Sequence, residues 1–430
     1  MESAFYNRLS NLLWGSIVSL VVMLAIYVSF GRLLMPMVGD NQGRILAQIN
    51  ARTPFTIATA ELSAQWRSFS PELVFADLRL EFPDSEGLLL QRGSVTIDIW
   101  RSLSSRSLRL SSLRLQGLAL AGELTAEGRF LLQGFGRRGG DTRAWLEALL
   151  LDIEQVTLAD NTLELDLPTG IRETLELDLT LVRDGSRRQL RAQLEAASGT
   201  QLTVLADGLG NPFVADDYSG EVYARAALAD LAQLARWQPL LGPTLPVNAS
   251  GAAEVEAWLS WSKGISGLQT RFTGEQLRLQ VEGSSLELPV DALAVDASLQ
   301  QRGQRWTLFT GELALQSGGV DLQLPRVQLD LWGDSLRLRS AGVPLADVSE
   351  LIVHSGSLPP ALVDVITELA PAGMLGALEL RLEDVGAPAG SWAVDTQFSD
   401  LSLAPWRGVP GVEGSSGYLQ LVPGVGSIVL

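Results

Sequence analysis

The feature that most constrains the fold is an alternation of aliphatic and polar residues, which recurs from about Ala58 to the end of the chain. Clear examples are residues 163–167, 175–181 and 277–281, which read LELDL, LELDLTL and LRLQV. Successive side chains of a strand point to opposite faces, so this period of two gives each strand one apolar and one polar face. Turn-forming dipeptides such as Asp184-Gly185, Asp207-Gly208 and Gly318-Gly319 separate the runs. The pattern predicts a mainly β protein, a long, twisted antiparallel sheet of dozens of short strands.

The apolar face of such a sheet has to be removed from water, and the alternation allows two ways to do so. The sheet could fold back on itself as sandwiches with a dry core, which is the commoner use of an apolar stripe. It could instead curl into a trough whose apolar interior holds another molecule. Both arrangements require the same alternation, so the pattern alone does not distinguish them.

The N-terminus carries a different signal, because residues 12–30 contain no charged side chain and lie between Arg8 and Arg32. A bilayer core about 30 Å thick needs roughly 20 apolar helical residues to cross it. A cleaved signal peptide would have a shorter apolar core and a small-residue cleavage site, which this segment lacks. Residues 1–32 therefore predict a short cytoplasmic tail and an uncleaved transmembrane anchor, with the rest of the chain exported. The predicted anchor residues are Leu12, Trp14, Val21, Tyr27 and Phe30.

Helical spacing interrupts the alternation at a few places. Residues 33–50 predict a juxtamembrane helix that continues from the anchor, and four short helices are expected at residues 143–151, 227–237, 344–353 and 360–369. No proline-rich, serine-rich or charged linker divides the remainder. We therefore expect residues 51–430 to form one continuous β region.

Composition and motifs exclude several functions. The formal net charge of −17 argues against binding to nucleic acid, which requires basic patches. With no cysteine and a single histidine, His354, the chain cannot form a thiolate metal site or a histidine-based metal cluster, and no catalytic motif is present. Residues 134–139 (GFGRRG) match a dinucleotide-binding fingerprint by letter, but no parallel α/β alternation follows. We expect no enzyme activity, no catalytic residues, no metal and no cofactor.

Four sequence blocks carry a resemblance to a known family. These blocks are residues 57–73 (IATAELSAQWRSFSPEL), 95–103 (VTIDIWRSL), 113–120 (LRLQGLAL) and 405–414 (PWRGVPGVEG). Their order after a single N-terminal transmembrane helix resembles that of the YhdP family of AsmA-like bacterial envelope proteins. Members of that family are much longer, so the chain resembles their N-terminal portion.

The resemblance implies the trough rather than the sandwich. It implies a bridge anchored in the bacterial inner membrane, with its large part in the periplasm, that carries phospholipids to the outer membrane along a hydrophobic (β-taco-like) groove. Other envelope proteins would be possible partners. The remaining alternative is a membrane-tethered β scaffold or assembly factor with a dry core. On the trough reading, the groove is lined by Leu108, Leu110, Leu163, Leu165, Leu167, Leu175, Leu177, Leu179, Leu277, Leu279, Val327, Leu329, Leu331, Leu378 and Leu380.

Overall fold

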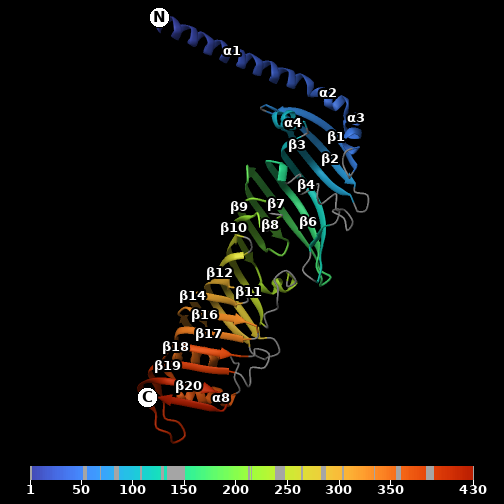
Figure 1. The fold of residues 1–430 in the computed structure, drawn as a ribbon. Coiled ribbons are helices and arrows are strands. Elements are labelled where there is room, and N and C mark those ends of the chain that lie inside the picture. The colour runs from blue at the N-terminus through green and yellow to red at the C-terminus, as the bar shows by residue number, and fades with distance from the viewer. Residues whose placement is uncertain are drawn as a thin grey trace. The chain divides into compact units, whose positions relative to one another are not determined.

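The protein is mainly β and begins with an apolar helix, as predicted (Figure 1). The computed structural model describes residues 2–51, 56–67, 69–81, 87–106, 109–126, 130–132, 151–211, 214, 216–237, 247–262, 265–281, 287–302, 305–333, 335–354, 360–383 and 392–429. Within these ranges 21 strands belong to one sheet, whose first and last strands each pair with a single neighbour. The described pairs are antiparallel except β4 with β6, which run parallel. The predicted fold class is therefore confirmed as a long sheet that is not closed.

Contacts within the chain define two units, Met1–Leu194 and Glu195–Leu430. The N-terminal unit contains the helices α1 (Glu2–Leu34), α2 (Pro36–Asp40), α3 (Gln42–Asn50) and α4 (Ile99–Ser105). Its strands are β1 (Thr56–Arg67), β2 (Ser70–Glu81), β3 (Leu88–Ile97), β4 (Leu110–Leu124), β5 (Phe130–Leu132), β6 (Gln155–Asp166), β7 (Arg172–Asp184) and most of β8 (Arg187–Ala196). Whether residues 51–430 act as one continuous β region stays a prediction.

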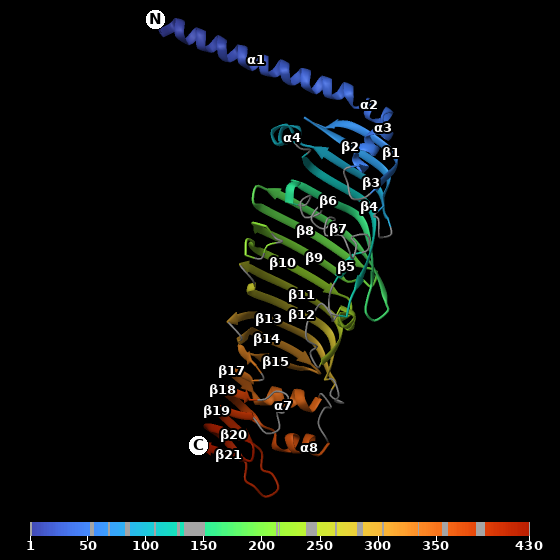
Figure 2. The same cartoon turned by 45° about the vertical axis from the view of Figure 1, so that its right-hand side comes forward.

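The C-terminal unit contains one 3-10 helix, η1 (Leu231–Trp237), and two α-helices, α7 (Leu345–His354) and α8 (Pro360–Leu369). Its strands are β9 (Gln201–Leu209), β10 (Ser219–Leu228), β11 (Val247–Ser262), β12 (Ile265–Val281), β13 (Glu287–Arg302), β14 (Arg305–Ser317), β15 (Val320–Leu324), β16 (Val327–Trp332), β17 (Ser335–Pro344), β18 (Ala372–Leu382), β19 (Trp392–Leu403), β20 (Val412–Val422) and β21 (Val425–Val429). Figure 2 shows α7 and α8 next to each other, and α7 contacts strands β15, β17 and β18.

Among the described residues, the strands are fewer and longer than the sequence pattern predicts. β4 runs through 15 residues without a turn, because Gly117, with a φ of +68°, allows a local irregularity that keeps the strand paired. The turn predicted at Asp207-Gly208 is wrong, because both residues pair with β10. A Cβ on Gly208 would lie 2.3 Å from the hydroxyl oxygen of Tyr218, so glycine serves close packing there. The turns at Asp184-Gly185 and Gly318-Gly319 are confirmed.

The predicted helices are mostly confirmed. The 33–50 segment is helical but broken near Met35 and Asn41, and α7 and α8 match the predicted positions within one residue. The prediction of a helix over residues 227–237 is wrong at its start, because Ala227 and Leu228 pair with β11 and only the later residues form η1. The predicted helix at 143–151 lies outside the described residues except for its last position, and so does the glycine-rich segment at 134–139.

The edge of β1 is covered by α3 through side-chain hydrogen bonds. The Asn50 side chain accepts from the backbone N–H of Ile57 at 2.8 Å and donates to its carbonyl at 3.1 Å. The Gln42 side chain accepts from the N–H of Leu62 at 3.3 Å and donates to the carbonyl of Thr59 at 3.5 Å. These bonds replace part of the ladder that a neighbouring strand would supply.

Candidate functional site

The apolar face of the C-terminal unit carries a continuous row of aliphatic side chains, one from each of eleven consecutively paired strands. We call this the central row, and each member directly faces the next across a strand pair. It consists of Ala206, Val222, Leu259, Leu268, Leu299, Leu308, Leu329, Leu338, Leu380, Val394 and Leu421. All eleven are half-buried. With about 4.8 Å between neighbouring strands, the row extends over about 48 Å.

Toward one end of the strands, the same face is fully covered. Leu228, Leu277, Val290, Leu315 and Leu322 form a buried core, with exposed fractions between 1% and 8%. The 3-10 helix η1 and helix α7 cover this core with Leu231, Leu234, Val348 and Leu351. We call this covered end of the apolar face the closed edge. Here the alternation produces an ordinary dry core, which supports the strands that carry the central row.

Between the closed edge and the central row lies a row of short side chains. It consists of Ala224, Ala257, Thr270, Ala297 and Thr310, which face one another across five strands. Short side chains leave space above the sheet where longer ones would fill it. On the other side of the central row, Trp306, Leu331, Leu336, Leu382 and Trp392 oppose one another in the same way. Leu331 is 38% exposed, so the apolar face opens toward this end of the strands.

Charges are held on the opposite face by ion pairs. Arg225 lies 2.8 Å from Glu254, and Arg271 lies 2.8 Å from Asp296. The carboxylate of Asp395 accepts hydrogen bonds from the Arg381 guanidinium and the Tyr418 hydroxyl, and both lower its pKa. None of the central-row members is charged. The sheet therefore has an uncharged apolar face and a solvated polar face, on which these arginines and carboxylates pair with one another.

The residues predicted to line the groove divide between these regions. Leu329 and Leu380 belong to the central row, Leu331 lies on its open side, and Val327 and Leu378 both face Ser340. Leu277 is buried at 1% in the closed edge, against which Leu279 packs. Their contact with a lipid stays a prediction.

In the N-terminal unit, the predicted leucines follow β6 and β7. Leu163, Leu165, Leu167 and Leu175 are buried, with exposed fractions of 2–7%, whereas Leu177, Leu179 and Leu110 are half-buried. Leu108 lies outside the described residues. Sequence reasoning missed Asn161, which is 1% exposed and faces Leu177 across the strand pair. Its side chain accepts from the N–H of Leu118 at 2.9 Å and donates to the carbonyl of Leu177 at 3.2 Å.

Helix α1 is long and apolar enough to cross a membrane. The apolar span found among the described residues covers Leu13–Asp40, with only 6% of its most hydrophobic window buried. Trp14, Val21 and Phe30 are each more than half exposed, as lipid-facing residues would be, and Leu12 lies within the helix.

Tyr27 has a different environment from the other predicted anchor residues. Its hydroxyl donates to the carbonyl of Phe69 at 2.8 Å, and its ring meets that of Trp66 edge-on at 5.3 Å. Tyr27 therefore joins helix α1 to the β1–β2 turn region rather than standing free at the membrane surface.

Comparison with known proteins agrees with this arrangement. The family model described as YhdP protein matches residues 1–430. A curated relative, the intermembrane phospholipid transporter YhdP of Escherichia coli (strain K12), is 25% identical over 447 residues. The match covers 96% of this chain and 33% of the relative, so the chain spans about a third of that protein's length. No solved structure matches the chain. The curated relative is a transporter rather than an enzyme, which agrees with the expectation of no enzyme activity. The match over all 430 residues shows that the chain belongs to the YhdP family.

Proposed function

We propose that the chain is part of a bridge that carries phospholipids between the inner and outer membranes of a bacterium. Helix α1 would cross the inner membrane with its short N-terminal tail in the cytoplasm, and the sheet would lie in the periplasm. The acyl chains would move along the apolar face while the headgroups stay in water. The curated relative's description as an intermembrane phospholipid transporter supports this assignment at the family level.

The observation that carries the proposal is the central row, which is aliphatic, half-buried and unbroken across eleven strands. Exposing an acyl chain to water costs about 0.8 kcal/mol per methylene, which is roughly 20 kcal/mol for two ordinary chains. A continuous aliphatic floor removes much of this cost. Because the floor is chemically uniform and has no polar group, it holds no single position of the chain preferentially, which favours movement.

A second function, a membrane-tethered scaffold with a dry core, is favoured by the closed edge. Leu163, Leu165 and Leu175 of β6 and β7, and the cluster beneath η1 and α7, are as buried as a normal core. On this reading, the apolar face would stabilise the sheet and carry no lipid.

Photo-crosslinking in cells tests the two functions directly. A photoreactive amino acid would replace Leu177 or Leu329, with Glu176 and Gln328, the preceding residues on the opposite face, as matched controls. Capture of phospholipid at the leucine positions and not at the controls would support transport along the apolar face. A folded protein that captures no phospholipid at Leu177 or Leu329 would support the scaffold.

A further inference from the structure

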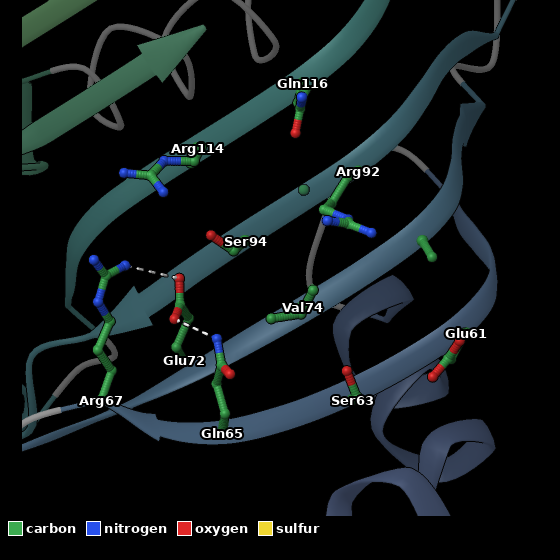
Figure 3. Close-up of a pocket in the computed structure, with 12 residues that line it drawn as sticks. Glu61, Ser63, Gln65, Arg67, Glu72, Val74, Arg92, Ser94, Arg114 and Gln116 are labelled. Carbon is green, nitrogen blue, oxygen red and sulfur yellow. Dashed lines mark hydrogen bonds and ion pairs between the residues drawn. The ribbon is translucent and has the colours of Figure 1, made fainter. Parts of the chain in front are cut away.

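The polar face of the N-terminal unit contains a cavity that the lipid groove does not use. It has a volume of about 440 Å³ and is lined by side chains of β1, β2, β3 and β4 (Figure 3). The cavity exists because its centre carries short side chains, among them Val74, Ala76 and Ser94, whereas long polar side chains surround them. Strand pairing therefore builds a walled polar hollow on the face opposite the apolar one.

One wall of the cavity contains a nearly buried carboxylate. Glu72 is 4% exposed, and its oxygens lie 2.8 Å from the Gln65 amide and 3.7 Å from the Arg67 guanidinium. Hydrogen bonds and ion pairs of this kind offset the cost of burying a carboxylate. The Arg67 guanidinium is therefore already paired with Glu72. Figure 3 shows the contacts of Glu72 with Arg67 and Gln65 as dashed lines.

Two further arginines line the cavity, and neither has a carboxylate partner among the described residues. Arg92 and Arg114 form no ion pair with any residue in the described part of the chain. Arg114 faces Ser94 directly, and Arg92 lies two residues from Ser94 on β3, so the two guanidinium groups flank one hydroxyl. The remaining carboxylate, Glu61, lies on β1, separated from Arg92 by Ala76 of the intervening strand.

Arg92 and Arg114 place two exposed positive charges at this hollow, in a chain whose formal net charge is −17. Among the described residues, several other strand arginines form ion pairs, as in the Arg225–Glu254 and Arg271–Asp296 contacts. The planar guanidinium group presents parallel N–H donors that match the oxygens of a phosphate, and two such groups can hold one tetrahedral anion. Strand β1, which supplies one wall of the cavity, also contacts helix α1, because Trp66 on the opposite face of this strand meets Tyr27.

We infer that this cavity is an anion site in which Arg92 and Arg114 bind a phosphate group, with the Ser94 hydroxyl between them. The phosphate belongs either to the headgroup of a phospholipid or to free inorganic phosphate, and both share the same chemistry at this site. The inference is independent of the apolar groove, because the cavity lies on the other face of the sheet.

The test uses the complete 430-residue chain in detergent and two probes, short-chain phosphatidylglycerol and inorganic phosphate. The Arg92→Gln/Arg114→Gln variant is compared with Arg44→Gln/Arg79→Gln, which removes two arginines of the same unit that do not line the cavity. Titration calorimetry should show at least about tenfold weaker binding in the cavity variant and unchanged binding in the control, because two charge-assisted contacts are lost.

The two probes distinguish the source of the phosphate. Loss of phosphatidylglycerol binding alone assigns the site to a lipid headgroup, and loss of binding to both probes assigns it to the phosphate group itself. If both variants bind both probes as the unaltered chain does, the inference is wrong. Circular dichroism of both variants checks that the sheet is intact. Lipid capture at Leu329 should persist in the cavity variant, so failure of the anion site and failure of the groove are separable.

Discussion

A charge placed in the central row should block lipid movement past it. Leu268 lies in β12 between Leu259 and Leu299, and the three side chains face one another directly. We choose Leu268→Asp because a short carboxylate cannot extend its charge to the open side of the face, as arginine could. Gln269→Asp is the matched control, since it adds the same charge one residue away on the polar face.

The expected size of the effect follows from the contact that is lost. Covering one leucine side chain is worth about 1.5–3 kcal/mol, which corresponds to a 10- to 150-fold slower passage. Desolvation of the carboxylate under a passing acyl chain adds to this barrier. The fall in rate should therefore be at least about tenfold.

The assay measures lipid arrival on both sides of the block. The chain is reconstituted into phospholipid vesicles through α1, with a photoreactive amino acid at Val222 or Val394 of the central row, and the initial rate of lipid capture is followed. Leu268→Asp should leave capture at Val222 unchanged and slow it at Val394, and Gln269→Asp should slow neither. Equal capture at Val394 in the two variants, with both folded by circular dichroism, would refute the role of the central row.

Three further predictions concern stability and the anchor. Leu277→Ala, at a side chain 1% exposed in the closed edge, should lower the free energy of unfolding by about 2–5 kcal/mol in urea titrations, whereas Leu331→Ala, 38% exposed, should lower it by much less. Gly31→Ala should detach α1 from β1, because a Cβ there would lie 2.5 Å from the Trp66 ring. With one cysteine introduced into each of the two elements, the disulfide-linked product should then be lost. Two backbone N–H groups hold the pKa of Asp230 below its usual value, so its contribution to stability is present above the unfolded-state pKa and is lost as the pH falls through the folded-state pKa. Asp230→Ala should therefore destabilise the chain at pH 7 by about 1 kcal/mol and remove this acid-side loss, measured by urea titration at pH 7 and pH 3.

Much of the fold could be predicted because two local signals are strong in this chain. Alternation of leucine with charged residues identifies strands such as β7, and Pro360 at the first position marks the start of α8. These signals act within a few residues, so they indicate which elements form and which face of each is apolar.

The composition of the central row could not be predicted, because it depends on how eleven strands align. Leu268 and Leu277 are nine residues apart in β12, and a strict period of two would place them on opposite faces. They share the apolar face because the strand is irregular at Gln276, where φ is +51° and the pairing with β11 changes register between Ser250 and Ala252. Nothing in the local sequence signals this shift. Leu268, Leu299 and Leu308, which the sequence analysis omitted, emerge only from the register.

The cover that α3 places on β1 has a consequence for how many copies can share one membrane. With α1 in the membrane as proposed, copies of the chain would hold their first strands at the same height above the bilayer, so bare strand edges would meet during lateral diffusion. An unprotected edge is a template for pairing with another molecule. Because Asn50 and Gln42 already occupy backbone groups of β1, such edge-to-edge polymerisation is disfavoured at the membrane surface. The helix thus acts as protection against two-dimensional aggregation and lets neighbouring copies remain separate.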